Sequence, residues 1–363
     1  MRIGIIGLPA TGKTSLFNLL CLGGGATPAP QSPTEPTRAV LKVPDPRLDD
    51  LARRFSATKV TPATVELVDF VAITKGAGQG EGLGSHFLAQ MRQADALLHV
   101  LRDFEDPGVP HVEESVDPVR DALTVHTELL LADLDVVEKR ILRLESDLKK
   151  GKKDEALREL DLLQRCRAWL AEERPIRDLE ITEEEEKLLR GFALLTARPV
   201  LLLLNVDESK IGGESPAAAR LRAELPGKDV GVTQLSVKVE WELAQLPPAD
   251  AESFRKDLGL PAGGFSSVIR ACYDLLGLIT FYTGEGGEET RAWTIPAGAT
   301  ALKAAGAIHS DLERGFIRAE VVRYADLVAL GSTAAVRKKG LHRVEGREYR
   351  VQDGDILLIR FNV

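Results

Sequence analysis

The stretch that decides the fold of this chain is RIGIIGLPATGKT, at residues 2–14. Residues 2–6 are rich in β-branched side chains and predict a strand. A loop with two glycines follows, and residues 13–20 have the composition of a helix. The segment GLPATGKT matches the pattern G-x-x-x-x-G-K-[ST] in the strand–loop–helix context that this pattern requires. The sequence therefore predicts an α/β domain that binds the phosphates of a purine nucleoside triphosphate.

Each residue type in this loop has a physical role in holding an anion. Gly7 and Gly12 let successive backbone N–H groups turn inward, and the positive end of the following helix adds to their field. Lys13 supplies an ammonium group for the β- and γ-phosphates, and Thr14 offers a hydroxyl to Mg²⁺. The predicted phosphate-binding set also contains Pro9, Ala10, Thr11 and Ser15.

The composition is that of a soluble globular protein with more than one core. The chain has 363 residues, of which 44% are hydrophobic and 28% charged, and this length predicts two or three domains. The net charge of −8 argues against a protein that coats nucleic acid with its whole surface, but it allows a local basic patch. No apolar run is long enough to span a bilayer, and no signal peptide precedes the first strand. We expect a cytoplasmic monomer that does not enter the membrane.

The pattern along the chain predicts three domains. Strands and helices alternate over 1–127 and again over 197–277, which is typical of one α/β domain with a mixed, mostly parallel sheet. Residues 128–196 have a helical pattern and form an insertion. From residue 278 to 363, short strands surround a small helix, which predicts a compact α+β module.

The inserted segment carries a heptad pattern. Apolar residues recur at alternating steps of four and three, and a second helical stretch follows a turn at 150–153. The two stretches contain Leu130, Leu134, Val137, Ile141, Leu144 and Leu148, and then Leu157, Leu160, Leu163 and Leu170. This predicts an antiparallel helical hairpin held by its apolar seam, with partner binding by the charged outer face as the alternative.

Three further segments fall where a nucleotide site needs polar groups. Asp69 ends the predicted strand 64–69, where a carboxylate can hold a metal-bound water. NVDE at 205–208 and the loop 236–238 each follow a strand, at the carboxyl edge of the sheet where ligands bind. Such residues also form turns, so each segment alone leaves both functions open. With the phosphate loop present, we assign to the nucleotide contacts Asn205, Val206, Glu208, Ser236 and Val237.

The segment 205–208 also bears on the choice of base. Guanine-selective proteins of this fold have N-K-x-D there, and its Asp pairs with guanine N1 and N2 hydrogens. This chain has Val206 for the Lys and Glu208 for the Asp, which moves the carboxylate by about one methylene. Adenine is therefore at least as good a fit as guanine, and the ligand is ATP or GTP.

The chain resembles the YchF/Obg-like ATPase family of translation-factor-class P-loop proteins over essentially its whole length. The segments that carry the resemblance include NVDE, GLPATGKTSLFN (7–18), VPDPRLDDLA (43–52), TPATVELVD (61–69), KGAGQGEGLGSHFL (75–88), RAWTIPAGATALKAAGAIHSDLERGFIRAEVV (291–322) and VQDGDILLIRFNV (351–363). The resemblance implies a G domain interrupted by a coiled-coil-like helical domain and followed by a ubiquitin-like (β-grasp) TGS domain. It also implies ATP in preference to GTP, slow hydrolysis helped by a partner or K⁺, and an association with ribosomes.

Two departures from the family pattern concern the switch segments. The family's D-I-A-G reads Asp69-Phe70-Val71-Ala72, and the Cβ of Ala72 restricts the backbone freedom that a switching glycine provides. Its T-I-E-P reads Pro33-Thr34-Glu35-Pro36, so the threonine expected at Mg²⁺ is displaced by one residue and Thr34 is a candidate. The predicted catalytic set is Lys13, Asp69 and Ala72.

These features support two hypotheses. The first is a slow Mg²⁺-dependent ATPase, or a GTPase, that regulates translation at the ribosome. The second is a nucleotide-gated ribosome or RNA adaptor that hardly hydrolyses, which Ala72 and the altered first switch favour. A basic cluster near the C-terminus is either a solvated face or a contact to ribosome or structured RNA. It comprises Arg337, Lys338, Lys339, Arg343, Arg347 and Arg350.

Overall fold

The computed structural model describes residues 1–23, 26, 36–70, 84–149, 154–227, 229–260 and 264–362. The chain divides into two compact units. Unit 1 contains Met1–Val40 and Glu66–Leu275, and unit 2 contains Leu41–Val65 and Leu276–Val363. Each unit has its own six-stranded sheet.

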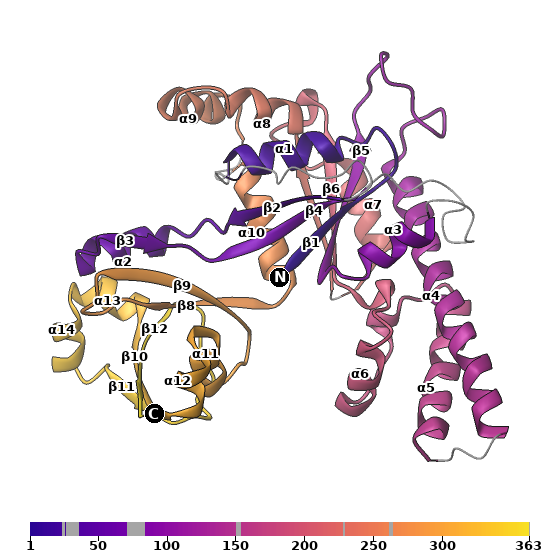
Figure 1. Cartoon of the computed structure of the whole chain (residues 1–363). Coiled ribbons are helices and arrows are strands. Elements are labelled where there is room, and N and C mark those ends of the chain that lie inside the picture. Colours follow the sequence, from indigo (N-terminus) through magenta and orange to yellow (C-terminus); the bar gives the residue numbers. More distant parts are fainter. Residues whose placement is uncertain are drawn as a thin grey trace. The chain divides into compact units, whose positions relative to one another are not determined.

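The sheet of unit 1 has the strand order β2-β4-β1-β5-β6-β7 (Figure 1). From β4 to β7 all neighbouring strands run parallel. Every residue of β5 and β6 is buried, as expected for central parallel strands with both faces covered. The strands are β1 (Arg2–Ile6), β2 (Thr37–Lys42), β4 (Thr64–Asp69), β5 (Ala96–Asp103), β6 (Val200–Val206) and β7 (Val230–Leu235).

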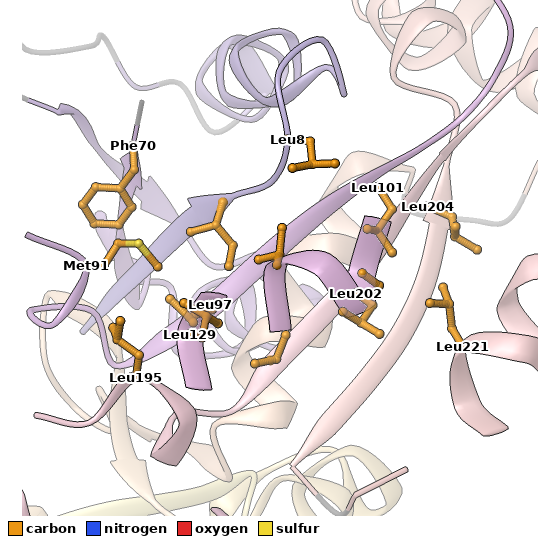
Figure 2. Close-up of a cluster of buried hydrophobic side chains, with 14 of the residues drawn as sticks. Leu8, Phe70, Met91, Leu97, Leu101, Leu129, Leu195, Leu202, Leu204 and Leu221 are labelled. Atoms are coloured by element: carbon orange, nitrogen blue, oxygen red, sulfur yellow. The ribbon is translucent and has the colours of Figure 1, made fainter. Parts of the chain in front are cut away.

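Helices pack on this sheet around an extensive apolar core. Leu97, Leu101, Leu202 and Leu204 of the central strands belong to one buried cluster with Leu129 of the long helix α4, and Leu97 lies beside Leu129 (Figure 2). Helices α1 and α10 contact each other, and α10 also contacts β6 and β7. The helices of this part are α1 (Lys13–Gly23), α3 (Gly84–Met91), α4 (Pro118–Lys149), α7 (Pro216–Glu224), α8 (Val237–Leu243), α9 (Pro248–Asp257) and α10 (Phe265–Leu275).

The helical insertion is continuous with this core. Helix α4 begins ten residues before the predicted boundary at 128, because no proline or glycine interrupts it there. Its first half packs on the sheet and its second half pairs with α5 (Asp154–Ala171). The apolar seam holds the hairpin as predicted, with Val137, Ile141 and Leu163 buried in one cluster.

One residue of the predicted seam is wrong. The side chain of Leu157 is 53% exposed. The seam on α5 passes instead through Ala156, four residues before Leu160, so that Leu157 points away from α4. Further along the insertion, Thr182 and Glu185 form a capping box that starts α6 (Glu183–Arg190).

Unit 2 is the compact α+β module that the sequence predicts, with the β-grasp order of elements that the family resemblance implies. A hairpin of β8 (Leu278–Thr283) and β9 (Glu289–Pro296) leads to α11 (Ala301–Ile308), and β12 (Asp355–Phe361) returns to pair in parallel with β8. The full order is β11-β10-β12-β8-β9-β3. The remaining elements are β3 (Lys59–Thr61), α2 (Pro46–Phe55), α12 (Ser310–Arg314), β10 (Phe316–Arg323), α13 (Tyr324–Leu330), α14 (Thr333–Lys338) and β11 (Arg343–Glu345).

The N-terminal part of the chain contributes to unit 2. The predicted boundaries place residues 41–65 in the nucleotide-binding domain, whereas they pack with the C-terminal residues. Strand β3 pairs in parallel with β9, and an Arg47 guanidinium nitrogen lies 2.6 Å from a carboxylate oxygen of Asp353. The buried Tyr282 hydroxyl donates a hydrogen bond to Asp45. These pairings join residues more than 200 positions apart in the sequence.

In the described part of the chain, no helix has the length and apolarity of a membrane-spanning segment.

A buried carboxylate joins α4 to the rest of unit 1 and provides a test of this packing. Asp133 accepts hydrogen bonds from the backbone of Leu195 and Thr196 and from Arg92, at 2.7–3.0 Å. We expect Asp133→Ala to lower the free energy of unfolding by about 3 kcal/mol, because it leaves these donors and the Arg92 charge unpaired. Chemical denaturation of the purified protein measures this change.

The matched control is Asp135→Ala, two residues away on the same helix. Asp135 is half exposed and forms an i,i+4 surface pair with Lys139, so its loss should cost less than about 1 kcal/mol. Equal stabilities of the two variants would contradict the structural role of Asp133.

Candidate nucleotide-binding site

The loop between β1 and α1 has the backbone shape that an anion site needs. Gly7 and Gly12 have φ of +147° and +94°, and Ala10 also adopts a positive φ of +61°. A Cβ on Gly12 would lie 2.4 Å from the Asn205 amide nitrogen, and one on Gly7 would lie 2.4 Å from the Val100 carbonyl oxygen. The glycines are therefore required both for the turn and for close approach of the loop to β5 and β6.

Lys13 is held against the loop in this structure. Its Nζ donates a 2.7 Å hydrogen bond to the Leu8 carbonyl, and the side chain is buried. Burial lowers the pKa of Lys13 to about 8, and the nearby Asp69 carboxylate partly opposes this shift. The ammonium group therefore donates to a neutral carbonyl oxygen. Negatively charged phosphate oxygens are stronger acceptors and would compete with that carbonyl for the ammonium group.

Thr14 and Asp69 come together as predicted for a metal site. The Thr14 hydroxyl donates a 3.0 Å hydrogen bond to Asp69 Oδ2, while Asp69 Oδ1 is buried without a hydrogen-bond partner. Burial raises the pKa of Asp69, against the opposing effects of Thr14 and Lys13. A hydroxyl beside an unsatisfied carboxylate oxygen fits Mg²⁺, which takes few protein ligands and completes its shell with phosphates and water.

Two predicted residues cannot be placed. Thr34, proposed as a metal ligand, and Ala72, proposed in the catalytic set, lie outside the described residues. Within the described ranges, no group of three or more His, Cys, Asp or Glu side chains could hold a metal by itself.

Asn205 has a role that the sequence does not predict. Its side-chain amide donates to the Thr11 carbonyl at 3.0 Å, and its amide oxygen accepts from the Val237 backbone at 3.1 Å. The residue therefore ties the phosphate loop to the loop that follows β7. A polar residue within an otherwise apolar strand end was the only signal of this role in the sequence.

The residues expected at the base lie around one cavity of about 660 Å³. Val206 is buried at the end of β6, and the Ser236 hydroxyl is buried without a partner. The exposed Glu208 carboxylate pairs with Lys238 at 3.5 Å. The residues predicted to contact nucleotide that line this cavity are Gly12, Ser15, Asn205, Val206, Glu208, Ser236 and Val237.

Two aromatic residues of the same cavity were not predicted. Phe104 follows the last residue of β5, and the Arg102 guanidinium lies 4.7 Å from the centre of its ring. Trp241 lies on α8, one turn after Lys238. An aromatic residue directly after a buried parallel strand is the signal that could have identified Phe104.

The comparisons with known proteins agree with this geometry. A family model described as "50S ribosome-binding GTPase" matches residues 2–133, and the model YchF-GTPase_C, described as a protein of unknown function, matches residues 278–362. The ribosome-binding ATPase YchF of Bacillus subtilis (strain 168) is 42% identical over 366 residues, covering 100% of both chains. This chain belongs to the YchF family.

Other YchF proteins match over the same extent. The ribosome-binding ATPase YchF of Escherichia coli O157:H7 is 39% identical and covers 100% of this chain and 99% of its own. The solved structure of the Schizosaccharomyces pombe YchF GTPase superposes with a TM-score of 0.85 at 31% identity, covering 99% of this chain and 97% of that one. The YchF architecture of a P-loop domain, a helical insertion and a C-terminal β-sheet domain therefore extends to this chain.

The lowered pKa of Lys13 predicts proton uptake on nucleotide binding. Phosphates favour the charged lysine, so affinity should be constant below pH 8 and fall as the pH rises through 8. Calorimetry in buffers of different ionisation heat should show uptake approaching one proton at about pH 9 and little at about pH 7. Lys238→Ala, which removes the exposed lysine of the same cavity, should leave this uptake unchanged. Tight binding at the higher pH without proton uptake would exclude Lys13 as the coupled group.

Proposed function

We propose that this chain is a ribosome-associated, Mg²⁺-dependent ATPase. The observation that carries the proposal is the arrangement of Lys13, Thr14 and the unsatisfied carboxylate of Asp69 around the phosphate loop. The names of its full-length relatives, ribosome-binding ATPases, support both the activity and the partner. A cytoplasmic location accords with a ribosomal partner.

Different residues of the site bind the phosphates and the metal ion. Lys13 exchanges the Leu8 carbonyl for the β- and γ-phosphates, and the backbone N–H groups of the loop surround them. Thr14 and Asp69 hold Mg²⁺, directly or through water, with Thr34 as a further candidate ligand. When bound, Mg²⁺ neutralises charge on the phosphates. K⁺ is a candidate for additional charge neutralisation in a site whose hydrolysis is slow.

The base side of the cavity favours ATP over GTP. Glu208 stands where guanine-selective proteins have Asp, and Lys238 already pairs with its carboxylate. Val206 provides an apolar wall where those proteins have Lys. A site that lacks the carboxylate geometry for the guanine N1 and N2 hydrogens loses the discrimination that such pairing gives.

Little or no hydrolysis is the alternative, as is binding of GTP. Ala72 in place of the family's glycine favours an adaptor that uses nucleotide as a switch. In either case, the contacts to ribosome or structured RNA are assigned to the TGS-like unit and the helical hairpin.

Phosphate release separates the enzyme from the adaptor. We expect purified protein with Mg²⁺ to release phosphate from ATP faster than from GTP, and Lys13→Ala to reduce release by at least about a hundredfold, as for loss of one transition-state contact. Measurable ATP affinity together with release equal to that of Lys13→Ala would support the adaptor instead.

The base preference should respond to a double substitution. Val206→Lys with Glu208→Asp recreates N-K-x-D, and we expect the ratio of GTP to ATP affinity to rise by more than about tenfold, or 1.4 kcal/mol. Competition binding with a fluorescent nucleotide measures the ratio. Asp207→Ala, in the same segment but with its carboxylate on the Ser209 backbone, is the matched control. A wild-type preference for GTP above tenfold would overturn the assignment.

A further inference from the structure

Basic charge is concentrated in unit 2. The whole chain carries a net charge of −8, but within unit 2 the Lys and Arg residues number 17 against 14 Asp and Glu. The rest of the chain therefore carries all of the acidic excess. A negatively charged partner would approach unit 2 in preference to unit 1.

Two arginines lie directly opposite each other on the sheet of this unit. Arg318 of β10 is the register partner of Arg360 of β12. The neighbouring residues Ala319 and Ile359 point to the other face of the sheet, where they pack with α11 in the core. Their side chains are 52% and 51% exposed, so both guanidinium groups reach solvent. Like charges on directly opposed strand positions disfavour pairing, so the fold gains nothing from this arrangement by itself.

One carboxylate lies next to both arginines. Glu320, only 11% exposed, receives Arg360 Nε at 2.9 Å and has Arg318 Nη2 at 3.7 Å. His342 Nε2 lies 3.6 Å from the other oxygen of Glu320. The arginine pair lowers the pKa of Glu320, so the carboxylate stays ionised while the surface keeps an excess of positive charge. Arg360 uses Nε and Nη2 on Glu320, and the remaining guanidinium nitrogens of the two half-exposed arginines are suited to phosphate groups.

Helix α14 extends this surface. Arg337 pairs with Glu285 at 3.0 Å, and the same Glu285 carboxylate interacts electrostatically with Arg360. Lys338 and Lys339 follow Arg337 and are exposed. We call the set Arg318, Arg360, Arg337, Lys338 and Lys339 the basic face.

The basic face differs from the cluster seen in the sequence. Arg343 is used internally, where it bonds the Tyr349 hydroxyl at 2.8 Å. Arg347 lies on the helix side, since its carbonyl accepts from Leu302 of α11. Arg350 bonds the Gly298 carbonyl. The sequence cluster is therefore divided between two sides, and the structure adds Arg318 and Arg360 from other strands.

We infer that the basic face binds the phosphate backbone of structured RNA. This inference rests on the proposed ribosome association and assigns the RNA contact to a defined surface. The two strand positions that flank Glu320, Val344 and Leu358, are aliphatic, so the charged groups on this part of the sheet are Glu320 and the arginines. Arginine and lysine contacts to nucleic acid go mainly to phosphate oxygens, so the chemistry favours backbone contacts on a folded RNA without sequence preference.

The test compares two pairs of arginines in the full chain. Arg318→Ala with Arg360→Ala removes the centre of the basic face. Arg314→Ala with Arg347→Ala removes the same charge from unit 2, next to α12 and α11 on the other side of the sheet. The probes are a fluorescent RNA duplex of about two helical turns, measured by anisotropy between about 0.05 and 0.2 M salt, and purified ribosomes, measured by co-sedimentation.

We expect the first pair to weaken duplex binding by at least about tenfold and to reduce the slope of log K against log salt by about 1.5, or about 0.7–0.9 for each lost phosphate contact. Ribosome binding by this variant should fall in parallel. The variant Arg314→Ala with Arg347→Ala should keep most of its duplex binding and most of its ribosome binding. Lys338→Ala with Lys339→Ala, which leaves the sheet untouched, should weaken duplex binding in the same direction. Melting temperatures and phosphate release from ATP report whether each variant is folded.

The outcomes distinguish this inference from the proposed function. If the wild-type protein and the variant Arg318→Ala with Arg360→Ala bind ribosomes equally well, the basic face is not the surface that contacts the ribosome. The ribosome association itself then stands. If the first pair loses ribosomes but wild-type protein does not bind the duplex, the partner is an acidic protein surface and the RNA assignment is wrong. If wild-type protein binds neither probe, both proposals fail, and phosphate release still tests the ATPase separately.

Discussion

The side-chain amide of Asn205 is the interaction on which the nucleotide site depends. One end holds the Thr11 carbonyl of the phosphate loop and the other holds the backbone of Val237. Both ends are buried, so neither bond is replaced by water at low cost. The phosphate half and the base half of the site are thereby fixed at one spacing. Gly12 is part of the same constraint, since any side chain there would occupy the position of the Asn205 amide.

A second constraint links this site to the C-terminal unit through the chain itself. Strand β4 starts at Thr64, within the segment 41–65 that packs in unit 2, and ends at Asp69, the carboxylate beside Thr14. The segment that precedes it in the chain, up to residue 36, contains the first-switch candidate Thr34. Segment 41–65 of unit 2 is therefore flanked in the sequence by two proposed Mg²⁺ ligands, Thr34 before it and Asp69 after it.

Ion pairs join separate elements within each unit. Glu240 and Arg255, a buried bidentate pair, and Asp133 with Arg92 hold helices of unit 1 in place. In unit 2, Asp45, Arg47 and Asp353 join the borrowed segment to the sheet. The pair Arg318 and Arg360 contrasts with these, because their single shared carboxylate leaves positive charge facing solvent.

The sequence by itself determined the features that depend on neighbours in the chain. The phosphate loop, the alternation of buried strands and helices, the capping box at Thr182 and the heptad seam all follow from local spacing, and the resemblance named the family. Tertiary structure decided what depends on residues brought together from afar. The residues of β3 form only a three-residue strand, so nothing local shows that segment 41–65 belongs to unit 2. The bridging role of Asn205 and the pairing of Arg318 with Arg360 have the same origin. Hydrogen bonds between strands and across loops are set by register and topology, and a single sequence does not encode these in its periodicity.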